Sequence, residues 1–135
     1  MAPDVLHLIL CDRVEMDPEN YHRYNIFGLV TSIRTRMPQF PVTHPRLVAL
    51  LVWTGGPASG ELALRIVQDQ SLTTVFRTPT HQVRLVGDPS AIGGGLFLIR
   101  NCAFPSAGLY WVEVLFAGSV IARQRLLVRV PGSLP

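Results

Sequence analysis

The sequence predicts an all-β protein, an antiparallel β-sandwich of about eight or nine short strands with little or no helix. Three observations lead to this prediction. Short runs with apolar residues at alternate positions recur along the chain, and turns rich in Gly and Pro separate them. No segment repeats its apolar residues with the helical period of about 3.6 positions over three turns. In residues 108–130 two alternating runs meet at a Gly-containing turn, which is the local pattern of a β-hairpin.

The length of 135 residues fits one domain that can bury a hydrophobic core without disulfides or metals. We expect a single β-sandwich domain over residues 1–135, with its core over about 4–130 and a flexible tail at 131–135. Apolar residues make up 48% of the chain, and the mean hydropathy is +0.31. This hydropathy is high for a soluble monomer, so we expect either a layer on both faces of one sheet or apolar surface kept for a partner.

The first half of the chain predicts three strands. Residues 5–12 alternate loosely and predict a first strand, whereas 13–25 are polar and turn-rich and predict a long loop. Residues 25–33 predict a second strand, in which Gly28 suits a bulge or a close backbone contact. Prolines at 38, 41 and 45 exclude a helix between residues 36 and 46. The near-continuous apolar run 46–53 predicts a central strand covered on both faces.

The second half predicts six more strands, the last two being the hairpin within 108–130. The other four span 61–69, 73–77, 81–86 and 95–104. Residues 87–95 predict a flexible connection that ends in Gly93-Gly94-Gly95. We interpret this triplet as a flexible strand entry, because the helix start or Lys-Ser/Thr pair of a phosphate-binding loop does not follow it.

The turn of the hairpin decides which strand faces align, because side chains alternate with a period of two. A two-residue loop would set Val112 beside an arginine. We therefore predict a three-residue loop with Gly118 in the left-handed conformation and a G1 bulge. The expected pairs are Val114 with Val120, Val112 with Ala122, and Trp111 with Arg123. Arg123 would then lie over the indole of Trp111.

Several segments carry resemblances to known proteins. Gly108 followed by Tyr110 at the start of a late strand resembles the tyrosine corner of immunoglobulin-like sandwiches, although Val112 stands where antibody-type domains have a cysteine. Three further segments are the opening Leu-Cys-Asp strand followed by Asn25-Ile-Phe-Gly-Leu-Val, Phe40-Pro41 before the apolar strand, and Phe104-Pro-Ser-Ala-Gly-Leu-Tyr-Trp-Val-Glu-Val. Together they resemble a family of small bacterial domains of unknown function. This resemblance implies an immunoglobulin-like sandwich over nearly the whole chain and no catalytic residue.

Charge and cysteine content limit the possible settings and partners. The net charge is +3, and the chain contains arginine but no lysine. A charge this small argues against a dedicated nucleic-acid binder. We identify neither a signal peptide nor a membrane span, so we expect a cytoplasmic protein without a membrane partner. Cys11 and Cys102 are then expected to be reduced and buried in strands, and a disulfide would require those strands to be adjacent.

No pattern predicts catalytic chemistry, a metal or a cofactor, so we expect a protein that is not an enzyme. No His-x-x-x-His, Cys-x-x-Cys or Gly-x-Ser-x-Gly motif is present. Four carboxylates cluster in residues 12–25, namely Asp12, Glu15, Asp17 and Glu19. They match no EF-hand and leave two interpretations: a solvated loop with local ion pairs, or a sandwich that binds calcium or carbohydrate through this loop.

The odd-numbered face of the hairpin is the predicted interaction surface, because interfaces favour Trp and Arg. Its residues are Trp111, Glu113, Arg123, Arg125 and Leu127. Val48, Leu50 and Val52 of the central strand form a second apolar face. The leading hypothesis is a non-catalytic interaction or assembly module that binds another protein or itself as a homo-oligomer. The alternative function is the ligand-binding sandwich that uses residues 12–25. For the hairpin surface itself, the plainest interpretation is an arginine-rich face that keeps the sheet soluble.

Overall fold

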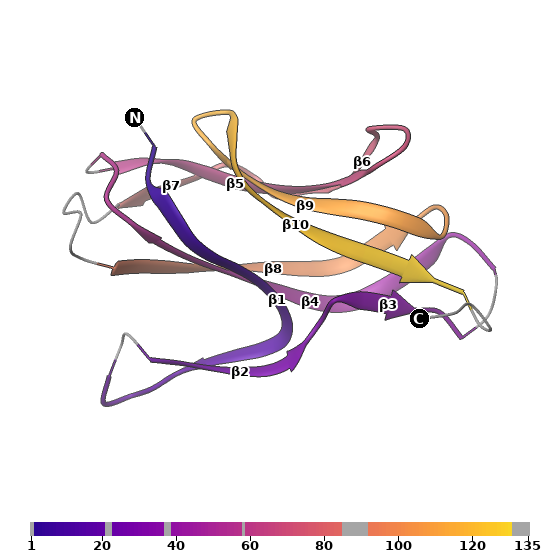
Figure 1. Ribbon diagram of the computed structural model, residues 1–135, viewed down its shortest axis with the longest axis horizontal. Helices are drawn as coiled ribbons and strands as arrows, with labels where there is room; N and C mark the ends of the chain where they lie inside the picture. Colours follow the sequence, from indigo (N-terminus) through magenta and orange to yellow (C-terminus); the bar gives the residue numbers. More distant parts are fainter. Residues whose placement is uncertain (1, 21–22, 37–38, 58, 85–91, 131–135) are drawn as a thin grey trace.

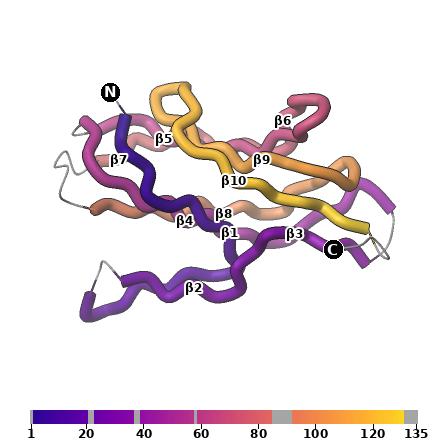
Figure 2. The backbone as a smooth tube through the Cα atoms, viewed as in Figure 1, coloured from indigo at the N-terminus to yellow at the C-terminus, as the bar shows by residue number. Residues whose placement is uncertain are grey.

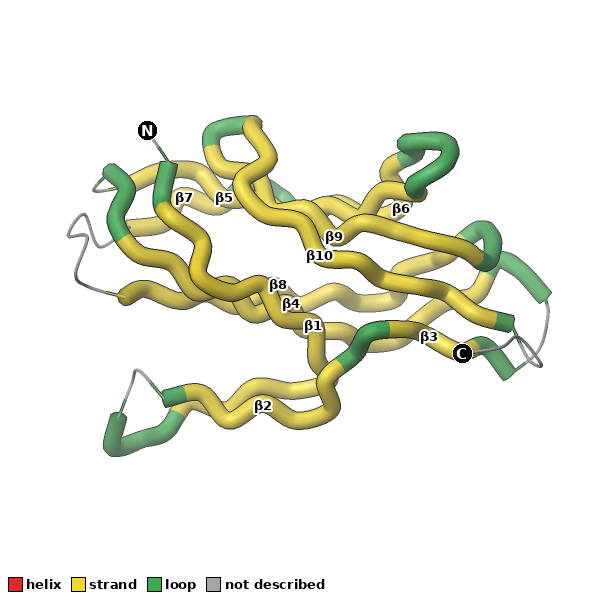
Figure 3. The backbone as a smooth tube through the Cα atoms, in the orientation of Figure 1, coloured by secondary structure: helices red, strands yellow, loops and turns green. Residues whose placement is uncertain are grey.

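Two sheets packed face to face make up the fold in the computed structural model, which describes residues 2–20, 23–36, 39–57, 59–84 and 92–130 (Figure 1). These residues form ten strands and no helix, so the predicted all-β sandwich is confirmed with slightly more strands than expected (Figure 3). No described segment forms a helix long and apolar enough to cross a membrane. The tail expected at 131–135 lies outside the described residues.

The first sheet has the strand order β2–β1–β4–β8, and all its pairs are antiparallel. Its strands are β1 (Asp4–Met16), β2 (Tyr24–Leu29), β4 (Val42–Thr54) and β8 (Ile92–Phe104). The second sheet has the order β3–β10–β9–β5–β6, with β7 also paired to β5. Its strands are β3 (Ser32–Arg34), β5 (Ser59–Gln68), β6 (Thr74–Arg77), β7 (His81–Arg84), β9 (Gly108–Phe116) and β10 (Ser119–Arg129).

The sandwich is not wholly antiparallel, because β3 pairs with β10 in parallel. Residues 25–33 were expected to form one strand, yet the chain leaves the first sheet after Leu29 and joins the second at Ser32 (Figure 2). At this crossing the Val30 N–H donates to the Leu10 carbonyl over 2.8 Å, and the Thr35 N–H donates to the Arg129 carbonyl over 2.9 Å. The strand is divided because its two halves satisfy backbone groups in different sheets.

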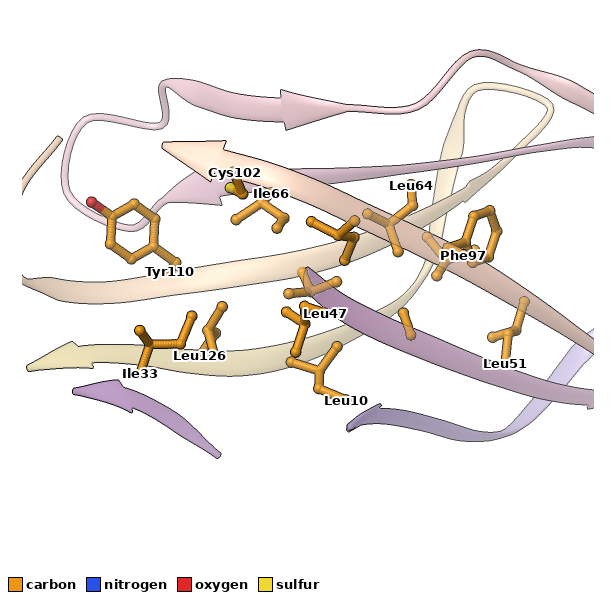
Figure 4. Close-up of a cluster of buried hydrophobic side chains, with 14 of the residues drawn as sticks. Leu10, Ile33, Leu47, Leu51, Leu64, Ile66, Phe97, Cys102, Tyr110 and Leu126 are labelled. Carbon is orange, nitrogen blue, oxygen red and sulfur yellow. The ribbon is translucent and has the colours of Figure 1, made fainter. Parts of the chain in front are cut away.

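The core lies between the sheets and takes one face of β4. Leu47, Ala49, Leu51 and Trp53 belong to it, and Figure 4 shows Leu47 and Leu51 among side chains of both sheets. Every residue of β4 from Leu47 to Trp53 is buried, so the predicted coverage of both faces is confirmed. The second apolar face, Val48, Leu50 and Val52, is therefore closed to a partner. Exposed apolar side chains of this sheet face lie one strand further out, at Ile92, Leu96 and Leu98 of β8.

The predicted loop over 13–25 is wrong at its two ends, which are strand, whereas residues 17–20 and 23 lie outside strands as expected. β1 continues to Met16 and β2 begins at Tyr24, and β1 changes partner at Cys11, which pairs with both Val48 and Leu29. Beyond Cys11 the two strands form a ribbon that bends away from the sheet (Figure 1). Such an exposed ribbon accepts polar side chains on both faces, which is why composition alone indicated a loop. Gly28 has the expected close contact: its φ is 68°, and a Cβ at this position would overlap the Asp12 carboxylate.

The turn of the β9–β10 hairpin differs from the predicted one. Phe116 pairs with Ser119, so the loop holds two residues, Ala117 and Gly118, with φ values of 49° and 84°. Two positive φ values identify a type I′ turn. The predicted three-residue loop is wrong, although the left-handed Gly118 is confirmed. A bulge between Val120 and Ala122 then shifts the register by one residue.

Beyond this bulge even-numbered residues again face even-numbered ones. The observed pairs are Val114 with Ala122, Val112 with Gln124, and Trp111 with Arg125. The predicted pairs were each wrong by two positions. The extra residue that the apolar faces require sits in the strand rather than in the loop, because a type I′ turn matches the twist of the two strands and a bulge can absorb the mismatch.

The tyrosine corner is confirmed. The Tyr110 hydroxyl donates to the Ser106 carbonyl over 2.7 Å and accepts the Ser106 N–H at 3.3 Å. The Tyr110 side chain is fully buried and meets the Phe104 ring edge-on, with the ring centroids 4.9 Å apart. One side chain thus closes the loop between β8 and β9 and fills the core beneath it.

Candidate functional site

Strand β8 is an open edge of the first sheet. It pairs along its whole length with β4, and within the described chain no other strand pairs with it. An edge strand directs backbone N–H and C=O groups away from its sheet, where they can pair with another chain. Residues 92–99 contain no charged residue and no proline, which are the usual means of blocking such pairing. Ile92, Leu96 and Leu98 are 47%, 54% and 40% exposed. The edge is therefore apolar, open and unprotected.

The three glycines that begin this strand are packing positions, and their assignment to a flexible connection was wrong. A Cβ at Gly93 would lie 2.6 Å from Nε1 of Trp53, and a Cβ at Gly95 would lie 3.3 Å from the same ring. A Cβ at Gly94 would overlap the hydroxyl of Tyr24. The strand is thus held between an indole on its core side and a tyrosine on its outer side, and both fit because the glycines have no side chains. Residues 87–91 of the predicted connection lie outside the described residues, as do 85–86 of the predicted strand 81–86.

A cleft of about 550 Å³ opens beside this edge, between β8 of the first sheet and β6 and β7 of the second. Its volume lies within the range of small-molecule and peptide sites, about 300–1,000 Å³. The apolar lining residues are Trp53, Leu62, Phe76, Val83 and Phe97, with Pro79 and the β8 residues beside them. Arg77, His81 and Arg84 are the basic lining residues, and the described lining contains no acidic residue. By register Arg77 lies opposite Arg65 and Arg84 opposite Ser59, so both arginines belong to the rim of the cleft, on the outer face of the second sheet. The cleft combines an apolar lining with one sign of charge.

The turn between β6 and β7 forms one wall of this cleft and is fastened to the sheet. The Thr78 hydroxyl oxygen accepts the Leu64 N–H at 2.9 Å, and the Thr78 N–H donates to the Leu64 carbonyl at 2.9 Å. Register places His81 opposite Leu62, on the core side of β5. The wall is therefore preformed, since its position depends on backbone hydrogen bonds to a core strand.

Trp53, which lines the cleft, carries a buried and unsatisfied hydrogen-bond donor. Its side chain is 4% exposed, and its buried Nε1 has no acceptor among the described residues. A buried donor without a partner costs about 1–3 kcal/mol, so such groups are rare in native proteins. The other tryptophan, Trp111, follows the usual rule and donates its Nε1–H to Asp69 over 2.8 Å.

The surface predicted from the hairpin is a connected polar cluster on the outer face of the second sheet. The Arg123 guanidinium lies 4.0 Å from the centre of the Trp111 ring. Glu113, with a side chain only 9% exposed, accepts from Arg65 over 2.8 Å and from Arg123 over 3.0 Å. Arg65 of β5 and Asp69, directly after β5, were missed by sequence reasoning, because only the fold brings them beside β9.

The remaining two residues of that surface lie at its side. Arg125 pairs with Trp111 across the strands, whereas Leu127 lies beside Ser32 of β3. Both line a shallower hollow of about 320 Å³ together with Thr31, Ser32, Gln124 and Arg129. The structure thus gathers Trp111, Glu113 and Arg123 into one cluster and places Arg125 and Leu127 next to it. The polar groups of the cluster are largely bonded to one another.

The carboxylates of residues 12–25 do not gather into a metal site in the described chain. Glu15 pairs with Arg13 at 3.5 Å, and Asp17 lies 4.0 Å from Arg23 while accepting the Glu19 N–H at 2.9 Å. No three His, Cys, Asp or Glu side chains meet among the described residues. Their positions fit local ion pairs and an Asx-type turn. His22 lies outside the described residues.

The two cysteines are buried free thiols, as expected. Cys102 belongs to the core, where burial raises the pKa of its thiol to about 12. Burial also raises the pKa of Cys11, and the adjacent Asp12 carboxylate raises it further. Because the thiolate is the reactive form, neither cysteine is an activated nucleophile.

Comparisons with known proteins identify a family and assign no activity. The sequence matches a family described as "Family of unknown function (DUF6941)" over residues 6–129. No curated protein matches the chain. One solved structure, an alkylpurine DNA glycosylase of Pseudomonas fluorescens bound to DNA containing an abasic-site analogue, is 12% identical with a TM-score of 0.47; the match covers 90% of this chain but only 30% of the glycosylase chain. An immunoglobulin-like protein of Pseudomonas aeruginosa is 11% identical with a TM-score of 0.42, over 96% of this chain and 98% of that one.

Proposed function

Because this chain belongs to the Family of unknown function (DUF6941), which transfers no activity, we propose from its geometry that it is a non-catalytic protein-interaction module. The observation that supports this proposal is the open, uncharged edge of β8. Edges of this kind bind extended segments by strand addition: backbone hydrogen bonds supply affinity, and pockets for alternate side chains supply specificity. The cleft beside β8 is such a pocket.

The hairpin surface around Trp111 supports the same function less strongly. An interaction hot spot needs side chains that gain contacts on binding. Glu113 and Trp111 already have hydrogen-bond partners, and Arg123 already lies over an aromatic ring. A partner at this surface would replace internal contacts, whereas a partner at β8 would add new ones. We therefore place the primary contact at β8 and keep the Trp111 surface as a predicted secondary contact.

Selection of peptides from a displayed random dodecapeptide library tests this proposal. Enriched peptides are labelled, and their dissociation constants are measured by fluorescence anisotropy with the wild-type protein and with a Leu96→Lys/Leu98→Lys variant. Both residues are exposed, so the variant should fold, and lysine on an edge strand opposes strand addition. We expect binding at least about tenfold weaker than wild type, a loss of roughly 1.4 kcal/mol.

The matched control is Leu29→Lys, at an exposed position of β2 on the opposite edge of the same sheet. It should bind the selected peptides like the wild type. Failure to select any binding peptide would refute the proposal, and so would equal binding by the β8 variant. Light scattering of the unliganded protein gives one more outcome. If the protein is a dimer and the β8 variant is a monomer, the partner at β8 is a second copy of this chain rather than a foreign protein.

A further inference from the structure

The cleft beside β8 has features that specify the chemistry of its occupant, and the inference drawn from them rests on the proposed interaction function. The register of β4 with β8 sets two faces: Gly95 and Phe97 lie opposite core residues of β4, while Leu96 and Leu98 lie on the outer face. A strand added to β8 continues this alternation. Every second side chain of the added strand therefore turns toward the cleft, and the others lie beside Leu96 and Leu98.

The cleft accommodates an apolar side chain from the middle of the added strand. Trp53, Phe76 and Phe97 line the cleft from both sheets. A volume of about 550 Å³ admits a large side chain together with its flanking backbone. Burying a large apolar side chain contributes about 1.5–3 kcal/mol, so this position would anchor the segment.

The charge of the lining favours an acidic partner over a second copy. Arg77, His81 and Arg84 line the cleft, and no described lining residue is acidic. Two copies joined edge to edge at β8 would bring these basic groups toward one another, and like charges across an interface oppose association. A segment with Asp or Glu beside its apolar anchor would instead meet complementary charge. These observations argue against self-pairing and for a foreign acidic segment.

The Trp53 indole adds a requirement for a hydrogen-bond acceptor. Its buried Nε1 lies against Gly93, at the start of the same edge. Among the described residues it has no acceptor. We infer that the cleft and the β8 edge bind an extended, acidic–apolar segment of a partner protein, with its apolar side chain over Trp53 and Phe97, its carboxylate toward Arg77, His81 and Arg84, and one of its oxygens accepting the indole N–H.

Three octapeptide probes test this inference. They share a central apolar Val-Phe-Val-Val core and carry Asp, Asn or Lys on both sides of it. Dissociation constants are measured by fluorescence anisotropy at low and high salt, about 0.05 and 0.5 M. The acidic probe should bind about tenfold more tightly than its amide counterpart at low salt, and this preference should shrink at high salt because rim charges are screened.

Charge reversal locates the preference. In an Arg77→Glu/Arg84→Glu variant the acidic probe should lose its advantage over the amide probe, while the control Arg34→Glu, at an exposed position of β3 on the opposite edge of the second sheet, should keep it. Equal binding of acidic and amide probes to the wild type overturns the inference and leaves the interaction function standing. Absence of binding by all three probes, together with failure of the library selection, refutes both.

Indole NMR signals provide a separate readout. The chain has two tryptophans, so a ¹⁵N-labelled sample gives two indole N–H resonances, which a Trp111→Phe variant assigns. The acidic probe should shift the Trp53 resonance downfield, as expected for a new hydrogen bond. The Trp111 resonance, already bonded to Asp69, should not move. A shift confined to Trp111 would place the probe on the hairpin surface and overturn the inference.

Discussion

Replacing Gly93 by alanine tests the packing that shapes the β8 edge. The new Cβ would lie 2.6 Å from Nε1 and 2.7 Å from Cε2 of Trp53, closer than real Cβ contacts come. Trp53 is 4% exposed and cannot swing away, so the core must yield. Overpacking of this kind costs about 1–3 kcal/mol, and replacing a strand glycine by alanine returns about 0.5–1 kcal/mol. We expect Gly93→Ala to lower the free energy of unfolding by about 1–2 kcal/mol.

Gly95→Ala is the matched control for this measurement. It changes the same residue type, two positions along the same face, against the same ring, but its Cβ would meet Trp53 at 3.3 Å and 3.5 Å. Urea unfolding should therefore show it within about 0.5 kcal/mol of the wild type. In a Trp53→Phe background, which removes the crowded ring atoms, the Gly93→Ala penalty should largely vanish. Equal effects of the two alanines, or an undiminished penalty in that background, would show that the indole does not crowd Gly93.

Three further substitutions have predictable effects on unfolding. Tyr110→Phe leaves the Ser106 carbonyl without its donor and should cost about 1–2 kcal/mol in urea unfolding; a cost under about 0.3 kcal/mol would contradict the tyrosine corner. Glu113→Gln weakens two arginine contacts and should cost about 1–2 kcal/mol, with the exposed Arg125→Gln within about 0.5 kcal/mol as control, and equal losses would contradict the cluster. Burial raises the pKa of Cys102 from 9.0 to about 12. The contribution of the buried, protonated thiol to the free energy of unfolding is therefore fully present below pH 9.0 and is lost as pH rises toward 12. Unfolding free energy should fall over that range less steeply in Cys102→Ala, and identical pH profiles would refute the assignment.

Local patterns predicted the strands well and the connections poorly. Alternation identified β5, β6 and β10, and the apolar run identified β4. The polar composition of residues 13–25 concealed a strand pair, because a ribbon that leaves the sheet has no buried face to mark it. The hairpin shows the same limit in another form. The alternation of side chains between the two faces required one extra residue between Val114 and Ala122. Alternation alone could not decide whether that residue lies in an odd-length loop or in a bulge.

The candidate site is harder to foresee, because an edge is a property of strand order. Trp53 of β4 and Arg77 of β6 reach one cleft only because their two sheets come together beside the edge strands β8 and β6. The sequence still carried a signal: residues 92–99 contain no charged residue, which is unusual for a strand that solvent reaches.

The glycines in that strand sharpen the interpretation of its apolar edge. Gly93 and Gly94 make room for Trp53 and Tyr24, so packing accounts for them without any ligand. Packing does not account for Leu96 and Leu98, which are exposed where a lysine would protect the edge. It also leaves the Trp53 donor without an acceptor among the described residues. The features that internal packing leaves unexplained are those that an added acidic–apolar strand would satisfy, and this coincidence is the reason to look for the partner at β8.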